Sequence, residues 1–257
     1  MTNLIGISGK KGSGKDTVAK IIQCLTAGYP HNQILIAFEK DLFPEYPLYA
    51  NKKYADKLKD IVCILIGCTR EQLEDPEFKE TPLGERWTKY PVSVDTVINP
   101  LDSENCDVGE ELYYFTTKEE AERFASRKTV EREDYEAEAF VEDKETLTPR
   151  QILQQLGTEV GRQIHPSAWV NALFVDYTSK NHNKWIISDV RFPDEAQAIK
   201  DRGGILIKVN RDTDDDQHES ETALDGYTGW DYVIDNNGSI EGLIDQVETV
   251  LKQFKII

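Results

Sequence analysis

Residues 9–17 read G-K-K-G-S-G-K-D-T, and their types and spacing indicate phosphate chemistry. They follow the apolar strand-like run 4–8 and precede an amphipathic helical pattern over 16–25. Strand, glycine-rich turn and helix in this order are the setting of a phosphate-binding loop. Backbone N–H groups and the helix N-terminus attract anionic oxygens, while Gly12 and Gly14 let the backbone approach them closely. The alternative is a glycine-rich turn that contains a lysine by chance.

Lys15 occupies the position of the lysine that reaches the β- and γ-phosphates in such loops. The next residue is Asp16, where the usual pattern has a Ser or Thr hydroxyl for Mg²⁺, and Thr17 follows. A carboxylate is also a hard oxygen ligand for Mg²⁺, directly or through water. It adds negative charge beside a polyanion, so a metal or arginines must compensate. We favour a metal-related role for Asp16 and keep helix capping as the alternative.

A second polar cluster follows an apolar segment in the second half of the chain. The run I-I-S-D-V-R-F-P-D-E-A places Asp189 and Arg191 just after an expected strand over 184–188. Ligands of open α/β sheets bind at the carboxyl ends of the strands. We therefore expect Asp189 to anchor a water of Mg²⁺, and Arg191 to bridge donor and acceptor phosphates. An Asp–Arg pair that caps the next helix is the alternative.

Further cationic side chains are Arg150 and Arg162 in one helical segment, and Arg211 and His218 after a later strand. Guanidinium groups bind phosphate oxygens bidentately. Phosphoryl transfer requires positioning and charge neutralisation more than covalent catalysis. No Ser-His-Asp or Cys-His arrangement points to a covalent mechanism.

Apolar runs alternate with helical patterns along most of the chain, which predicts a parallel sheet with helices on both faces. Gly157 is expected to interrupt the helix that begins at Arg150. The expected strands are 4–8, 33–38, 184–188, 205–209 and 231–234. The expected helices are 16–25, 54–66, 69–78, 150–156, 167–176, 193–201 and 239–254.

Residues 91–148 have a different, strongly acidic composition. A helical pattern over 118–127 lies between strand-like segments 111–116 and 135–141. We interpret this part as an inserted β-α-β-like flap within a single domain over 1–257. It is expected to be peripheral to the chemistry, as a lid or a dimer contact.

Composition excludes several classes of protein. The 257 residues include 47 acidic and 30 basic ones, a formal charge of −17, which disfavours binding to nucleic acid. No apolar stretch is long enough for a membrane span, and no signal peptide is evident. The four cysteines show no zinc-like spacing, which is typical of free thiols in a reducing compartment. A cytoplasmic location is therefore expected, the host cytoplasm if the chain is encoded by a phage.

Taken together, these segments resemble the deoxynucleoside monophosphate kinases of large bacteriophages. The resemblance rests on 9–17, Y-A-D-K-L-K (54–59), R-E-Q-L (70–73), L-Q-Q-L-G-T-E-V-G-R (153–162), S-D-V-R-F-P-D-E-A (188–196) and H-E-S-E (218–221). It implies a P-loop kinase fold with a helical acceptor-binding region over 39–90. It also implies transfer of the γ-phosphoryl group of ATP to a deoxynucleoside monophosphate (dNMP), with Mg²⁺. Self-association as a homodimer stays open.

The resemblance also implies roles for single residues. Catalysis falls to Lys15, Arg162 and Arg191, and Mg²⁺ to Asp16 and Asp189. The expected ATP-binding residues are Gly12, Ser13, Gly14, Lys15, Asp16, Thr17, Arg211 and Asn237. The expected acceptor-binding residues are Lys10, Phe38, Tyr54, Arg70, Arg150, Trp169 and Asp189. For the aromatic residues the alternative is core packing, which we favour for Phe38.

Two other functions stay open. One is a related small-metabolite kinase of the dephospho-coenzyme A or phosphomevalonate type, since D-Y-V-I-D-N-N-G-S-I-E-G-L (231–243) resembles the end of dephospho-coenzyme A kinases. The other is a non-catalytic nucleotide-binding switch, which the absence of a GTPase-like N-K-x-D motif disfavours. Competition between acceptors would separate the first from a dNMP kinase, and ATP binding without acceptor stimulation would favour the second.

Overall fold

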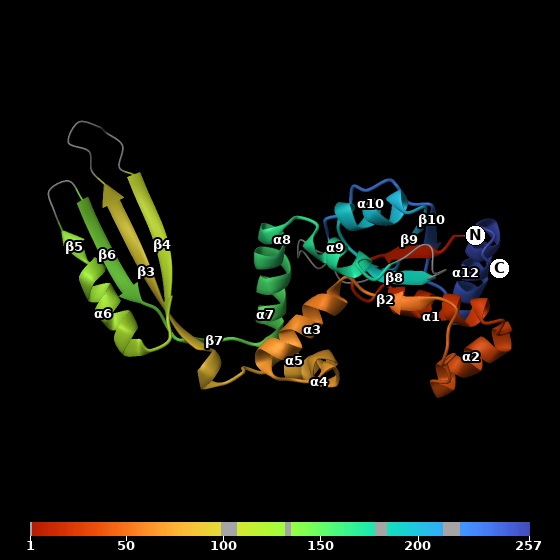
Figure 1. Cartoon of the computed structure of the whole chain (residues 1–257), viewed down its shortest axis with the longest axis horizontal. Coiled ribbons are helices and arrows are strands. Elements are labelled where there is room, and N and C mark those ends of the chain that lie inside the picture. Colours follow the sequence, from red (N-terminus) through yellow and green to blue (C-terminus); the bar gives the residue numbers. More distant parts are fainter. Residues whose placement is uncertain (1, 99–106, 132–134, 178–183, 213–221) are drawn as a thin grey trace. The chain divides into compact units, whose positions relative to one another are not determined.

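A five-stranded parallel sheet organises one part of the chain (Figure 1). The computed structural model describes residues 2–98, 107–131, 135–177, 184–212 and 222–257. The chain divides into two compact units, Met1–Ile61 with Leu156–Ile257, and Val62–Gln155. We call them the parallel-sheet unit and the antiparallel-sheet unit and describe each by itself.

The parallel sheet has the strand order β10-β9-β1-β8-β2. All four neighbouring pairs are parallel, and Ser8 at the end of β1 lies beside Val190 of β8 and Lys208 of β9. The strands are β1 (Leu4–Ser8), β2 (Ala50–Lys52), β8 (Trp185–Val190), β9 (Ile205–Asn210) and β10 (Tyr232–Asp235). The helices of this unit are α1 (Lys15–Thr26), α2 (His31–Lys40), α8 (Gly161–Ile164), α9 (Ala168–Phe174), α10 (Pro193–Asp201) and α12 (Ile240–Gln253).

Side chains alternate between two hydrophobic cores, one on each face of this sheet. Ile5, Ile7 and Ile207 pack with buried residues of α1, α2 and α12. Leu4 and Leu206 pack with α9 and α10 on the opposite face. Near-continuous apolar strands of this kind are buried on both faces. The predicted parallel sheet with helices on both faces is confirmed.

The antiparallel-sheet unit contains a second sheet of order β4-β3-β6-β5, and β7 pairs with β3. Helix α6 covers one face of it, where Ala121 and Ala125 pack against Val92 and Val94. The strands are β3 (Thr88–Ile98), β4 (Asp107–Phe115), β5 (Val130–Glu131), β6 (Tyr135–Val141) and β7 (Glu145–Thr146). The helices are α4 (Arg70–Glu74), α5 (Pro76–Glu80), η1 (Glu85–Trp87), α6 (Lys118–Lys128) and α7 (Pro149–Gln154). Helix α3 (Ala55–Ile66) and the π-helical segment η2 (Gln155–Val160) each continue from one unit into the other.

The predicted strand over 33–38 is wrong, because these residues belong to α2. Ile34 and Ala37 are buried three positions apart, which is a helical period that a short apolar run does not distinguish from a strand. The second strand of the sheet is instead β2, which has only three residues.

One helix prediction needs refinement and another needs correction. The α-helix that begins at Pro149 is interrupted around Gly157, as expected, but the chain stays helical there through the π-helical segment η2 and continues into α8. A Cβ on Gly157 would lie 2.7 Å from a Leu58 methyl group, so this glycine serves close packing. The single helix predicted over 69–78 is divided into α4 and α5, because Asp75 caps α5 and Pro76 occupies its first turn.

The insertion holds more strand than was predicted. Helix α6 and strand β6 match the expected segments, but β3 was not predicted at all. Proline is rare inside strands because it lacks an N–H donor, yet Pro91 lies within β3. Pro91 pairs with Tyr114 of β4. The pairing of β3 with β6 extends from Ile98 to Val92, so Pro91 lies just outside it. None of the described helices is both long and apolar enough to cross a bilayer.

We predict that the insertion can be removed without unfolding the parallel-sheet unit. Thr88 and Thr146 face each other across β3 and β7, with their hydroxyl oxygens 2.7 Å apart. An Asn-Gly turn replacing 90–144 would therefore close a hairpin between Lys89 and Glu145. The hydrophobic core of the removed segment shares no residue with the two described cores of the parallel sheet. Thermal unfolding followed by circular dichroism should keep a cooperative transition, and its loss would contradict this independence.

Candidate active site

The loop between β1 and α1 adopts the conformation that a phosphate-binding loop requires. Gly12 and Gly14 have left-handed φ angles of 78° and 95°, which glycine adopts without strain. A Cβ on Gly14 would lie 2.4 Å from the side-chain nitrogen of Asn236. The side chain of Asn236 also donates to the carbonyl of Ser13 at 2.8 Å. The loop after β10 thus holds the phosphate loop in place.

Lys15 begins α1 and curls back over this loop. Its ammonium donates to the carbonyl of Gly9 and to that of Lys10, the latter at 2.7 Å. The charged end of Lys15 therefore lies among the backbone carbonyl groups of the loop. In the same loop, the buried Ser13 hydroxyl has no hydrogen-bond partner among the described residues.

Asp16 is held between two neighbouring strands. One of its oxygens accepts from the Ser188 hydroxyl of β8 at 3.1 Å and lies 2.8 Å from the ammonium of Lys53, which follows β2. Partial burial raises the pKa of Asp16, but the hydrogen bond and charge of Lys53, with smaller effects of Ser188 and Lys15, together lower the pKa below the ordinary value. The negative charge that Asp16 brings to the loop is therefore balanced by Lys53.

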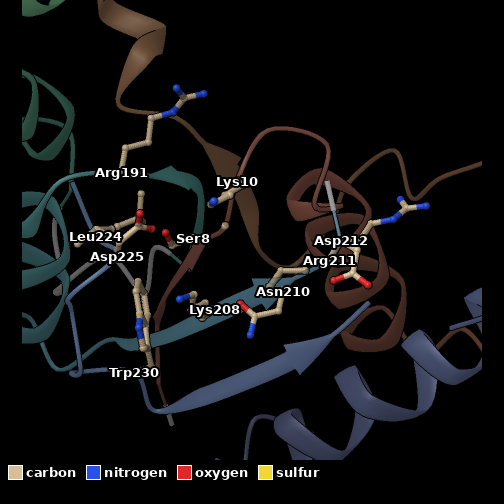
Figure 2. Close-up of a pocket in the computed structure, with 13 residues that line it drawn as sticks. Ser8, Lys10, Arg191, Lys208, Asn210, Arg211, Asp212, Leu224, Asp225 and Trp230 are labelled. Atoms are coloured by element: carbon tan, nitrogen blue, oxygen red, sulfur yellow. The ribbon is translucent and has the colours of Figure 1, made fainter. Parts of the chain in front are cut away.

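A cavity of about 390 Å³ opens at the carboxyl edge of the sheet beside this loop (Figure 2). It is bordered by Ser8 and Lys10 from the end of β1, Arg191 after β8, and Lys208 and Arg211 around the end of β9. In Figure 2 Lys208 lies near Trp230, while the guanidinium of Arg191 extends away from that tryptophan. Cationic groups from three adjacent strands thus border one cavity.

Asp189 is used to position an element. Its two oxygens accept from the backbone N–H groups of Tyr54 at 2.8 Å and Ala55 at 3.0 Å, at the start of α3. Burial raises the pKa of Asp189, although these two bonds oppose the rise. The carboxylate therefore fixes the N-terminus of α3 against the end of β8.

Glu195 organises the turn that carries Arg191. It is 3% exposed, and one oxygen accepts from the backbone N–H groups of Arg191 at 2.8 Å and Phe192 at 3.1 Å. Its other oxygen lies 3.2 Å from the guanidinium of Arg162. That guanidinium also pairs with Asp194 at 3.4 Å and stacks on the Phe192 ring, with 3.6 Å between its central carbon and the ring centre. Arg162 is thus anchored beside the turn that carries Arg191.

Comparison with known proteins shows which family the chain belongs to. The model of the deoxynucleotide monophosphate kinase family matches residues 3–247. This chain belongs to the deoxynucleotide monophosphate kinase family. The resemblance inferred from the sequence motifs is confirmed.

Several curated members of the family are similar to this chain. The deoxynucleoside-5'-monophosphate kinase of Escherichia phage T5 is 27% identical over 242 residues, which cover 87% of this chain and 86% of the relative. The putative deoxynucleotide monophosphate kinase of Acanthamoeba polyphaga mimivirus is 37% identical over 114 residues, 39% of this chain and 59% of the relative. The deoxynucleotide monophosphate kinase of Escherichia phage RB69 is 30% identical over 126 residues, 46% of this chain and 51% of the relative. The last two alignments thus span less than two thirds of the relatives' length.

The structure separates the aromatic residues expected to bind the acceptor base. Phe38 packs edge-on against Phe43, with ring centres 5.0 Å apart, beside the α1 core. Tyr54 is 3% exposed and donates its hydroxyl proton to the carbonyl of Glu195. Both side chains pack in the core of the parallel-sheet unit, and their contact with an acceptor base stays a prediction. Trp169 is partly buried, and its ring nitrogen donates to the carbonyl of Gly157 at 2.7 Å.

The remaining predicted residues of the kinase have defined contacts. Arg70 pairs with Glu74, and Arg150 pairs with Glu80, all within the antiparallel-sheet unit. Asn237 accepts from the backbone of Asp212, whereas its neighbour Asn236 contacts the phosphate loop. Thr17 lies in the first turn of α1. His218 lies outside the described residues.

Sequence reasoning missed Lys53, Lys208 and Trp230. Lys53 follows β2, a strand that was itself not predicted. Lys208 could have been singled out from the sequence. It is a charged residue within the apolar run Ile205–Asn210, which is unusual for a strand buried on both faces. No pattern in the sequence singled out Trp230.

The residues present fit a Mg²⁺ ion that arrives with the nucleotide. The described residues include no group of three or more side chains that could hold a metal by themselves. Mg²⁺ usually binds through one or two carboxylates together with substrate phosphates. Asp16 is 64% exposed at the start of α1, whereas both oxygens of Asp189 already accept hydrogen bonds. Asp16 is therefore the better placed of the two predicted ligands.

We predict that the stability of this kinase falls between pH 5 and pH 8. Burial and the nearby Asp189 raise the pKa of Glu195 to about 8, against the effects of the two N–H bonds and Arg162. The folded state therefore keeps a proton that the unfolded state releases near pH 4.5. The stabilisation that this proton gives the folded state is complete at low pH and is lost as the pH rises through 8. Within this range the free energy of unfolding falls by up to about 1.4 kcal/mol per pH unit.

Urea unfolding from pH 5 to pH 8.5 measures this slope. Glu195→Gln should flatten it, because a glutamine cannot titrate. Glu39→Gln is the control at an exposed carboxylate of α2 and should leave the slope unchanged. Equal slopes in wild type and Glu195→Gln would assign the pH dependence to other groups.

Proposed function

We propose that this chain transfers the γ-phosphoryl group of ATP to a deoxynucleoside 5'-monophosphate, giving the diphosphate and ADP, with Mg²⁺. The observation that carries the proposal is the cavity beside the phosphate loop, bordered by cationic groups from β1, β8 and β9. Two polyanions can meet only where their charge is neutralised. Membership of the kinase family supports the same reaction.

The phosphate loop would bind the donor. Its backbone N–H groups and the N-terminus of α1 face the phosphates, and Lys15 exchanges its bonds to the Gly9 and Lys10 carbonyls for phosphate oxygens. Asp16 would hold Mg²⁺, directly or through water. When bound, Mg²⁺ supplies positive charge to the phosphate oxygens. Arg211, together with the loop after β10, would lie along the nucleoside of ATP.

Lys10 and Arg191 would orient the acceptor phosphate in the cavity. Both border it, and the turn that carries Arg191 is fixed by Glu195. Charge spreads over the transferring group in the transition state, and fixed cations stabilise that charge without reorganising. Arg162, Arg70, Arg150 and Trp169 remain proposed as further acceptor-side residues.

Lys53 would balance the negative charge of Asp16, which occupies the position where phosphate loops usually have a Ser or Thr hydroxyl. Its ammonium lies 2.8 Å from Asp16. With Asp16 holding Mg²⁺, the ammonium of Lys53 would turn to a phosphate oxygen. The site would thus keep its charge balance in both states.

A panel of monophosphates assayed for ADP release tests the proposed function. We expect activity on one or more dNMPs with ATP and Mg²⁺. Lys15→Met should reduce turnover by at least about 100-fold, since it removes one fixed cation from the transition state. Absence of turnover with every common dNMP would contradict the proposal, and turnover with dephospho-coenzyme A alone would favour the metabolite-kinase alternative.

Calorimetric titration of ATP in EDTA tests Lys53. Lys53→Met should weaken binding about 10-fold, because it leaves Asp16 unpaired beside the triphosphate. Adding Asp16→Asn should restore most of the lost affinity. Lys57→Met, which removes a surface pair with Asp176, is the matched control. Equal affinities of wild type and Lys53→Met would refute the charge-balancing role.

A further inference from the structure

The C-terminal end of α3 brings two thiols together. The backbone N–H groups of Gly67 and Cys68 both donate to the carbonyl of Cys63, at 2.9 and 3.1 Å, and Gly67 has a left-handed φ of 73°. This is the glycine-dependent turn that ends many helices, and it places the residue after the glycine against the last helical turn. The Sγ atoms of Cys63 and Cys68 are accordingly 3.8 Å apart.

We propose that Cys63 and Cys68 form a reversible dithiol–disulfide site that controls the acceptor side of the reaction. Both residues are half-buried, so a small oxidant can reach them, whereas Cys24 is fully buried in the α1 core. A disulfide requires the two sulfurs to approach to about 2.05 Å with the Cα atoms within reach of each other. The backbone of the turn already holds the two residues together, so rotation of the side chains supplies the approach.

The two sulfurs have different roles. The Cys68 thiol donates its proton toward the sulfur of Cys63. Burial and this hydrogen bond raise the pKa of Cys68 to about 11, so Cys68 keeps its proton at neutral pH. Because the Cys63 sulfur accepts this hydrogen bond, we assign the first attack on the oxidant to Cys63.

Hydrogen peroxide is the oxidant class that balances the chemistry. The Cys63 sulfur attacks one peroxide oxygen, the O–O bond breaks, and a sulfenic acid and water result. The Cys68 sulfur then attacks the Cys63 sulfur, and the departing hydroxide takes the Cys68 proton as a second water. Two thiols lose two electrons and peroxide is reduced to two waters. A dithiol reductant reverses the change by thiol–disulfide exchange.

The position of the pair links it to acceptor binding. Cys68 immediately precedes Thr69, whose hydroxyl accepts from the backbone of Gln72 and caps α4, and Arg70 is the first residue of that helix. A disulfide would fix this helix start to the end of α3. This step rests on the proposed acceptor-side role of Arg70, whereas formation of the disulfide does not.

Peptide mapping by mass spectrometry tests the site in the full-length chain carrying Cys106→Ser, since Cys106 lies outside the described residues. After peroxide treatment we expect one peptide pair joined through Cys63 and Cys68, and its loss after reduction. Cys68→Ser should accumulate a dimedone-reactive sulfenic acid at Cys63, whereas Cys63→Ser should not do so at Cys68. Two unlinked thiols after treatment, or equal dimedone labelling of the two variants, would overturn the proposal.

Kinetics of the same samples test the control of the reaction. Oxidation should change the KM for dNMP at least 3-fold more than the KM for ATP, and reduction should restore both. Cys63→Ser should show neither change. An unchanged KM for dNMP in fully oxidised protein would refute the control. If the reduced protein has no kinase activity, the proposed function fails, while the mapping still decides whether the disulfide forms.

Discussion

Neutralising phosphate charge is the constraint on which this protein depends. The chain carries a formal charge of −17, so its average surface repels nucleotides. Binding requires that cations be gathered at one place and fixed there. The parallel sheet does this because the carboxyl ends of its strands meet at one edge. Lys10, Lys53, Arg191 and Lys208 belong to the ends of four different strands and reach this edge together.

Buried carboxylates keep this edge rigid. Asp189 and Glu195 each accept two backbone N–H bonds at the start of an element or turn. Burying such groups disfavours their charge, as their raised pKa values indicate. A stable fold tolerates this cost where it fixes the position of a functional residue. The site is therefore built at the expense of stability at neutral pH.

The sequence was sufficient for the parts of the site whose backbone chemistry is local. The glycines of residues 9–17 and the motif around Asp189 each require one conformation, and the structure has it. The environment of residues that contact distant parts of the sequence could not be predicted. The burial of Tyr54 depends on Phe174 and Glu195, which lie more than a hundred residues away in the sequence. Lys53 was missed because β2 has only three residues and no apolar period.

The phosphate loop departs from the usual pattern at one position, and the surrounding strands account for it. A serine or threonine after the lysine is neutral and needs no partner. Asp16 carries a charge, and it is accommodated by Ser188 from β8 and Lys53 from β2. Asp16 therefore ties the start of α1 to the ends of β8 and β2. A change at Asp16 alone would remove the carboxylate that lies 2.8 Å from the Lys53 ammonium, so the two residues have to be treated as one unit.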